Sequence, residues 1–280
     1  MSFPRTIIES LSVSRLIIGS NWFLGYSHTS AAKDQLINET MSAARIADIL
    51  VAFMQAGVDT FYGMRPEPIL VRALAEAQQR AGRALITVAI PTLPLNPDAA
   101  GRAEAARILD EHAALGVAIC MPHQATTDAF VNRRTQSLAG IEPYLAMIRE
   151  RGMLPGLSTH MPETPGYADA TGLDVATYIQ IYNAAGFLMQ IEVDWVQRMI
   201  WQARKPVITI KPLAAGRLMP LVGLAFAWST IRDCDMVCVG SSSPAEAEEL
   251  IELSYAILER RAPRVGLQET RSKASLQAKP

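Results

Sequence analysis

The chain has 280 residues, of which 50% are hydrophobic, and its formal net charge at pH 7 is -1. This length suits one large α/β domain, and the near-neutral charge argues against nucleic acid or an anionic membrane as a partner. No stretch approaches the roughly 18 apolar residues of a membrane span, and residues 1–16 lack the apolar core of a signal peptide. The three cysteines, an odd and low count, favour a reducing compartment, so a cytoplasmic location is expected.

Short apolar runs with the composition of buried strands alternate with helical patterns along the chain. The predicted strands are Leu16–Ser20, Val58–Tyr62, Ala84–Ile90, Val117–Met121, Leu154–Ser158, Ala176–Ile181, Val207–Ile210 and Met236–Val239. Apolar residues at helical spacing predict helices around residues 46–54, 69–77, 98–116, 144–152, 196–203, 221–228 and 247–258. A long polar connection follows the first strand, from Asn21 to about Ala43, and the Pro/Gly-rich stretch Pro162–Gly172 predicts a short or irregular helix.

Eight alternating βα units predict a parallel sheet, and in a chain of this length they predict a single (β/α)8 TIM barrel over residues 1–261. A doubly wound open sheet is the alternative. The first βα turn, residues 19–22, does not contain the glycine-rich dinucleotide fingerprint, which weakens that alternative. Residues 262–280 have little apolar content and predict a disordered tail.

The loops after the last two predicted strands are candidates for the functional site, because barrel active sites lie at the carboxyl ends of the strands. One loop carries the cations Lys211 and Arg217, and the other carries three hydroxyls, Ser241, Ser242 and Ser243, at the start of a helix. A phosphate group suits both loops. The alternatives for Lys211 are a Schiff base with a carbonyl substrate and a structural ion pair, and the alternative for Ser243 is helix capping alone.

Two histidines, His123 and His160, follow the fourth and fifth strands, so their side chains are expected to converge over the mouth of the barrel. Acid–base catalysis and shared metal ligation are the functions considered for them, and the alternative is two loop histidines held by backbone partners. No third ligand is identifiable, so no metal site is predicted, although a metal is not excluded. His112 lies on an apolar helix face, which predicts packing.

Asn21, Trp22 and His28 occupy the first βα loop, where they would line a substrate pocket; an aromatic plug over the barrel end is the alternative. Cys234 and Cys238 have no second pair of ligands, and Cys238 falls within an apolar strand, so packing is predicted instead of metal binding.

Four stretches of sequence carry a resemblance to a known family. They are LSVSRLIIG at 11–19, AGVDTF at 56–61, GLST at 156–159 with QIYN at 180–183, and the runs 211–218 and 239–244. Together and in this order they resemble the aldo-keto reductase superfamily over nearly the whole chain. The resemblance implies a (β/α)8 fold, NADP as a cofactor and reduction of a small carbonyl compound.

The superfamily uses an Asp, Tyr, Lys and His tetrad to protonate the carbonyl while NADPH delivers hydride. Tyr62 stands at the end of strand two, either in place of the Asp or as the tyrosine itself after a deletion. His123 stands close to the position of the family's His, displaced by Pro122. No lysine occurs in residues 84–92, where the family's Lys belongs, so a tyrosine of pKa about 10 lacks its usual tuning group.

The resemblance also assigns a cofactor side. Ser158 matches a residue that holds the nicotinamide carboxamide, and Gln180 matches a further position if one residue is deleted before Tyr182. Ile210 stands where an aromatic ring stacks on nicotinamide, and Lys211 stands where the next residue helps to hold the pyrophosphate. Together with the phosphate-site residues of the last two loops, the predicted cofactor-binding set is Ser158, Gln180, Lys211, Leu213, Arg217, Ser241, Ser242 and Ser243.

The leading hypothesis is therefore an aldo-keto-reductase-like barrel that reduces a small carbonyl compound with NADP, with Tyr62 or His123 as the proton donor. One alternative is a non-redox lyase, isomerase or hydrolase that uses His123 and His160, with or without a metal. The other is a non-catalytic binding protein on a reductase-derived scaffold. A small molecule is the expected partner, and the oligomeric state is not predicted.

Overall fold

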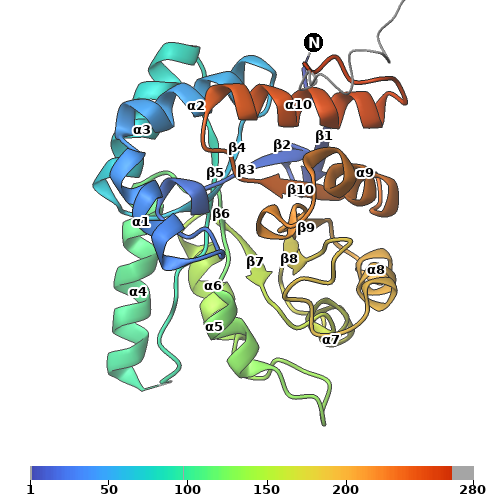
Figure 1. Ribbon diagram of the computed structural model, residues 1–280. Coiled ribbons are helices and arrows are strands. Elements are labelled where there is room, and N and C mark those ends of the chain that lie inside the picture. The colour runs from blue at the N-terminus through green and yellow to red at the C-terminus, as the bar shows by residue number, and fades with distance from the viewer. Residues whose placement is uncertain (1, 97, 267–280) are drawn as a thin grey trace, which may run out of the picture.

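The computed structural model describes residues 2–96 and 98–266 and contains a closed barrel of parallel strands (Figure 1). The strands are β3 (Leu16–Gly19), β4 (Thr60–Met64), β5 (Ile86–Ala89), β6 (Ile119–Cys120), β7 (Leu154–Ser158), β8 (Thr177–Ile181), β9 (Val207–Ile210) and β10 (Met236–Val239). They follow one another around the barrel in chain order, and β10 closes it by pairing with β3. The predicted (β/α)8 barrel is confirmed, and all eight predicted strands are present.

Helices surround the barrel (Figure 1). They are α1 (Ala31–Thr40), α2 (Ala43–Gln55), α3 (Pro68–Ala81), α4 (Ala99–Ala114), α5 (Gln124–Thr127), α6 (Glu142–Glu150), α7 (Thr164–Thr171), α8 (Val193–Gln202), α9 (Pro220–Thr230) and α10 (Pro244–Leu258). The helix expected to be short, α7, has 8 residues. One further helix, α1, lies in the polar connection from Asn21 to about Ala43, for which no helix is predicted. The tail expected to be disordered lies largely outside the described residues, which end at 266.

Apolar side chains form two layers, one inside the barrel and one between the barrel and the helices. The alternation of side chains along each strand separates the layers. On β4, Phe61 points outward and its ring lies 6.3 Å from that of Phe23, whereas Tyr62 points inward. The side chains that fill the barrel interior thus come from every second residue of a strand.

An antiparallel hairpin of β1 (Arg5–Ile8) and β2 (Leu11–Ser14) closes the amino-terminal end of the barrel. Its buried residues Ile8 and Val13 belong to the interior layer of the barrel. The hairpin side chains bind the amino-terminal ends of two strands, since Ser14 contacts the Thr60 hydroxyl at 3.1 Å and Thr6 donates to the Cys234 carbonyl at 3.0 Å. The barrel is therefore open at its carboxyl end alone.

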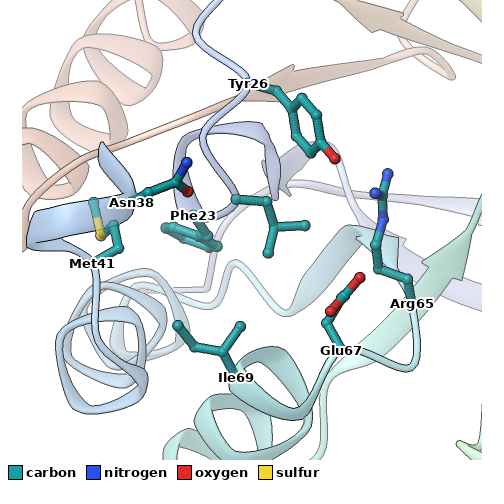
Figure 2. Close-up of a pocket in the computed structure, with 8 residues that line it drawn as sticks. Phe23, Tyr26, Asn38, Met41, Arg65, Glu67 and Ile69 are labelled. Carbon is teal, nitrogen blue, oxygen red and sulfur yellow. The ribbon is translucent and has the colours of Figure 1, made fainter. Parts of the chain in front are cut away.

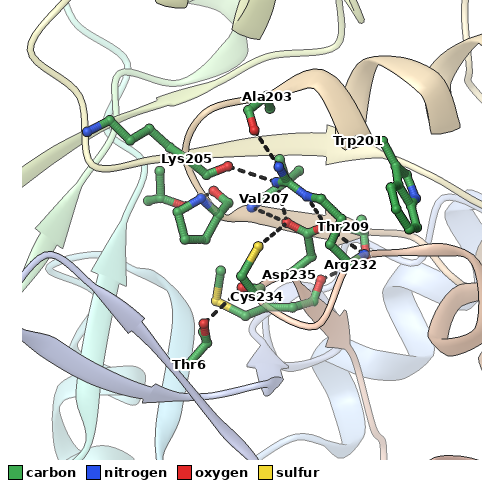
Figure 3. Close-up of polar contacts among 12 residues, drawn as sticks. Thr6, Trp201, Ala203, Lys205, Val207, Thr209, Arg232, Cys234 and Asp235 are labelled. Carbon is green, nitrogen blue, oxygen red and sulfur yellow. Dashed lines mark hydrogen bonds and ion pairs between the residues drawn. The ribbon is translucent and has the colours of Figure 1, made fainter.

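A buried carboxylate joins β9 and β10 at the same closed end (Figure 3). The fully buried Asp235 accepts a hydrogen bond from the Val207 amide at 2.8 Å, and others from the amide and guanidinium of Arg232 at 2.7 to 2.9 Å. Arg232 in turn donates to the Lys205 carbonyl at 2.9 Å and to the Ala203 carbonyl. Because a buried charge is tolerated only when it is paired in this way, the network fixes how both strands enter the barrel.

Cys234 and Cys238 do not form a ligand pair. The thiol of Cys234 contacts Asp235 at 3.7 Å at the closed end, whereas Cys238 packs inside the barrel towards its open end. Both are free, as is Cys120. Packing is therefore confirmed for Cys238.

Candidate active site

One cavity of about 790 Å³ lies at the carboxyl ends of the strands, where a barrel enzyme binds its substrate. Its wall contains all residues predicted as catalytic or as substrate pocket, together with three of those predicted to hold a cofactor. These residues are Asn21, Trp22, His28, Tyr62, His123, Ser158, His160, Lys211 and Leu213. Residues far apart in sequence thus meet because each follows or ends a different strand.

Lys211 follows β9 directly and is half-buried in the cavity wall. Its backbone takes φ = 61°, a left-handed conformation that costs about 1 kcal/mol or more in a residue with a side chain. Among the described residues its ammonium has neither an ion pair nor a side-chain hydrogen bond. Burial without such a partner lowers the pKa of Lys211 below its usual value.

Three histidines, His28, His123 and His160, lie near enough to Lys211 for its positive charge to lower their pKa values. Burial and then the charge of Lys211 lower the pKa of His160 to about 4, with smaller contributions from the other two histidines. The pKa of His123 is lowered by burial, Arg65 and Lys211, and that of His28, on the exposed rim, by partial burial and Lys211. At neutral pH the histidines are therefore held in the uncharged form, in which an imidazole both donates and accepts a proton.

Backbone hydrogen bonds orient the two inner histidines. The Nδ1 atom of His123 accepts the Ala125 amide hydrogen at 3.2 Å, which places the ring proton of the neutral form on Nε2. The amide of His160 donates to Asp128 Oδ2 at 3.1 Å, and the same carboxylate accepts the Thr159 hydroxyl. His123 is thus a fixed hydrogen-bond donor, whereas no hydrogen bond to a described residue fixes the His160 ring.

The first βα loop folds over one side of the cavity. It holds the 3-10 turn η1 (Asn21–Phe23) and α1, and its His28 has a left-handed φ of 56°. The Asn21 amide nitrogen lies 3.1 Å from His28 Nε2, which ties the rim histidine to the loop. The Trp22 ring packs so closely on Gly240 that a Cβ there would meet it at 2.6 Å. Trp22 thus packs on the backbone and also lines the cavity.

Tyr62 forms part of the cavity floor. Gly63, with φ = 96°, produces a register shift in β4 and allows Ser20 to approach. Burial raises the pKa of Tyr62 above its usual value, despite a hydrogen bond with Ser158 that lowers it. Burial likewise raises the pKa of the neighbouring Cys238 thiol to about 12. Both groups stay protonated at neutral pH, so neither is a base.

The remaining predicted cofactor residues do not line the cavity. Gln180 is buried, and its amide donates to the Met161 carbonyl at 3.2 Å. The guanidinium of Arg217 stacks on the Phe187 ring at 4.0 Å and lies outside the cavity. The hydroxyls of Ser241, Ser242 and Ser243 are used within the turn that begins α10.

The anion position at the start of α10 is filled by the protein itself. Oε2 of Glu246 accepts the Ser242 amide hydrogen at 2.6 Å and the Ser242 hydroxyl at 2.8 Å. Ser243 caps the helix by accepting the Glu246 amide hydrogen at 3.1 Å. A negatively charged phosphate would meet a carboxylate at this point, so the residues as arranged do not fit the phosphates of the dinucleotide that the resemblance implies.

Arg65 also belongs to the site, although its sequence position alone does not distinguish substrate binding from solvent exposure. It follows β4 and lines both the main cavity and a smaller one of about 190 Å³ (Figure 2). Its guanidinium lies 5.5 Å from the Tyr26 ring centroid, and Tyr26 also lines both cavities. A permanent cation therefore stands at the rim, held against the first βα loop. Glu246 was missed, although the spacing from Ser243 is that of a capping box.

Neither a metal-binding cluster nor a membrane-spanning helix is found among the described residues. The described residues contain no group of three or more His, Cys, Asp or Glu side chains that could hold a metal ion. Within the same residues, no helix has the length and apolar character needed to cross a membrane. His112 packs as predicted, with Nδ1 at 2.8 Å from the Ile108 carbonyl, and it also borders the cavity.

No family model and no curated protein matches this sequence. Among solved structures, a protein assigned to the aldo-keto reductases from Pseudomonas aeruginosa aligns with 91% of this chain and 94% of its own, with a TM-score of 0.66 and 14% identity. A protein assigned as a 2,5-diketo-D-gluconic acid reductase B covers 92% of both chains (TM-score 0.55, 12% identity). A truncated 3-deoxy-D-arabino-heptulosonate 7-phosphate synthase from Thermotoga maritima covers 92% of this chain and 90% of its own (TM-score 0.51, 9% identity). At these identities the likenesses establish the barrel fold, which this chain shares with structures assigned to the aldo-keto reductases and with other barrels.

Proposed function

We propose that this protein is an enzyme that binds a small anionic carbonyl compound and moves protons next to its carbonyl group, without a redox cofactor. The observation that carries the proposal is the position of Lys211. It enters one cavity together with His123 and His160 and has no anionic partner among the described side chains. A partly buried cation without a partner favours a negatively charged ligand.

The roles follow from the chemistry of each group. Lys211 and Arg65 attract the carboxylate or phosphate of the ligand. His123 donates its Nε2 hydrogen to the carbonyl oxygen and so stabilises the negative charge that develops there. His160, whose ring has no fixed partner, removes the proton from the carbon next to the carbonyl. Tyr62 closes the floor as a protonated phenol.

Reduction of the carbonyl by NADPH is the alternative that the sequence resemblance favours. Glu246 argues against it, because the carboxylate takes the amide and hydroxyl hydrogens of Ser242 that would face a phosphate. A fluorescence titration with NADPH tests this point. We expect no saturable binding at millimolar NADPH, and saturable binding would restore the reductase interpretation.

Hydrogen exchange tests the proposed proton transfer directly. Pyruvate and dihydroxyacetone phosphate, a carboxylate and a phosphate with exchangeable hydrogens beside the carbonyl, are incubated with the protein in D2O and followed by proton NMR. We expect exchange at least about tenfold faster with wild type than with His160→Asn, since general-base catalysis contributes 10²–10⁴-fold. Lys205→Met, at the closed end of the barrel, is the matched control and should retain the wild-type rate. Exchange of both compounds no faster than with an equal concentration of imidazole contradicts the proposal.

We also propose that the enzyme works in a reducing compartment such as the cytoplasm. The three cysteines support this location, because all of them are free thiols and two are buried.

A further inference from the structure

We infer that Lys211 is a covalent catalyst that forms an imine with the carbonyl carbon of its ligand. The inference rests on the proposed function, because it concerns the same cavity and the same ligand class, a small carbonyl compound that carries a carboxylate or phosphate. It assigns Lys211 a reaction, in addition to the electrostatic role described above.

The first support is the isolation of this side chain. Lys211 is half-buried at the open end of β9, next to the interior residues Ile210 and Cys238. The other described lysines are placed differently. The ammonium of Lys33 lies over the Trp22 ring at 5.2 Å, and Lys205 precedes the same strand at the closed end. Among the described lysines, only Lys211 lines the cavity, and it has no partner there.

The second support is the burial of the amine. The cavity wall carries the cation Arg65 and the carboxylates Glu111 and Glu246, and none of the described carboxylates forms an ion pair with Lys211. Burial lowers the pKa of Lys211, against a smaller opposing effect of Cys238, which leaves more of the amine unprotonated than in an ordinary lysine. An unprotonated amine beside a bound carbonyl group is the nucleophile of Schiff-base enzymes.

The third support is that a purely electrostatic role does not need a lysine here. Arg65 keeps its charge at every relevant pH and can hold the anionic group of the ligand from the rim. A lysine whose positive charge is disfavoured by burial is a poorer anchor for an anion than an arginine. The left-handed backbone of Lys211 also costs free energy. A nucleophile must be placed against one carbon atom and so needs a fixed backbone more than an anchor for an anion does.

The reaction balances with the groups present. The Lys211 ammonium gives one proton to His160, and the free amine attacks the carbonyl carbon. The new C–N bond turns the carbonyl oxygen into the hydroxyl of a carbinolamine, which takes a proton from the nitrogen. His160 then returns its proton to that hydroxyl, the C–O bond breaks, and water leaves. The product is a protonated imine, and no oxidant, reductant or net proton is required.

The transfer from Lys211 to His160 is helped by the coupling between them. Part of what holds the pKa of His160 low is the positive charge of Lys211. That charge disappears when the lysine gives up its proton, so His160 becomes a stronger base in the same step.

Reductive trapping tests the inference. The full-length protein is incubated at neutral pH with pyruvate or dihydroxyacetone phosphate, sodium borohydride is added, and the lysine-containing peptides are analysed by mass spectrometry. An imine reduced in place adds the mass of the probe less one oxygen atom. With only five lysines in the chain, the modified position is read directly. We expect modification at Lys211 at least tenfold above Lys205, because an amine with a lowered pKa is more often unprotonated.

Two variants make the result decisive. Lys211→Arg keeps the charge and removes the amine, so it should lose both trapping and hydrogen exchange, whereas Lys205→Met should keep both. Circular dichroism of each variant checks that it is folded. Equal modification of Lys211 and Lys205 by both probes contradicts the inference.

The two proposals fail in different ways. If Lys211→Arg keeps the hydrogen exchange that depends on His160, the imine is wrong and the proton-transfer function stands. If neither probe undergoes exchange with wild type, the proposed function is wrong. If Lys211 is then no more modified than Lys205, the imine is also wrong.

Discussion

The amide of His160 and the hydroxyl of Thr159 both donate to the carboxylate of Asp128, so a side chain from the preceding βα loop holds the loop that carries the histidine. We expect Asp128→Ala to lower the free energy of unfolding by about 2 kcal/mol, because two donors lose their acceptor. It should also reduce hydrogen exchange with pyruvate, since His160 is no longer held in place. Urea denaturation and NMR measure the two effects. Asp110→Ala, which removes an exposed ion pair with Arg151, should change neither by a comparable amount.

Lys211→Met should stabilise the protein while abolishing its activity. Burial lowers the pKa of Lys211 below its usual 10.5, so between the lowered value and 10.5 the unfolded chain binds more protons than the folded one. Wild-type stability therefore rises with pH through this window, and the full penalty applies below it. At neutral pH the variant should gain about 1 kcal/mol, the usual scale of a single stabilising substitution. Lys205→Met, the control, should show no gain in thermal or urea denaturation.

Acid should destabilise the protein through His160. Its pKa falls from the usual 6.5 to about 4 in the folded state, so the unfolded chain binds more protons between those values. Stability should decrease as the pH drops through this window and level off below it. In His160→Asn the decrease should be smaller by on the order of 1 kcal/mol, a figure reduced for solvent screening at a partly exposed ring. Urea midpoints across the window measure it, and equal pH dependence in both proteins contradicts the assignment.

Glu246→Ala should create an anion site that wild type lacks. The substitution frees the amide and hydroxyl of Ser242 at the amino terminus of α10, where an anion is favoured by about 1 kcal/mol. We expect roughly fivefold tighter binding of inorganic phosphate and of NADP by calorimetry. Glu249→Ala, an exposed position on the same helix, is the control. If the two variants bind these anions equally, Glu246 is not what excludes them.

Asp235→Ala should unfold the closed end of the barrel without touching the cavity. The change leaves the Arg232 guanidinium and the Val207 amide without their buried acceptor, which costs about 3–5 kcal/mol. The neighbouring Asp233 is fully exposed, so Asp233→Ala should have a far smaller effect on stability. Thermal denaturation distinguishes these outcomes.

The barrel was predictable because each strand is an apolar run bounded by polar residues. A parallel strand that is buried on both faces can be recognised from such a run alone. Two elements gave no such signal. On α1 only Ile37 is buried, so it has no apolar stripe, and β1 alternates over just four residues. The position of β1 depends on contacts far along the chain, such as that of the Thr6 hydroxyl with the Cys234 carbonyl.

Site residues could be predicted where the end of a strand determines their position. They could not be predicted where the direction of the side chain determines whether they reach the cavity. His123 and His160 follow adjacent strands, so position alone brings them to the cavity. Gln180 lies between Ile179 and Ile181, which both point inward, so alternation directs it outward. The resemblance to a family motif identified Gln180 from its position in the sequence and took no account of the face of the strand on which its side chain lies. The pairing of Glu246 with Ser242 was within reach of the sequence as a capping pattern, whereas the left-handed backbone of Lys211 was not.

The hairpin that fills the amino-terminal end of the barrel through Ile8 and Val13 has a kinetic consequence. Because one end of the barrel is closed, every ligand enters and leaves the cavity through the same opening. A ligand attached to Lys211 would lie between the closed end and any second reactant. In a two-substrate reaction the carbonyl compound would therefore bind first and leave last. Inhibition by excess of the second reactant is the pattern that steady-state kinetics should then display.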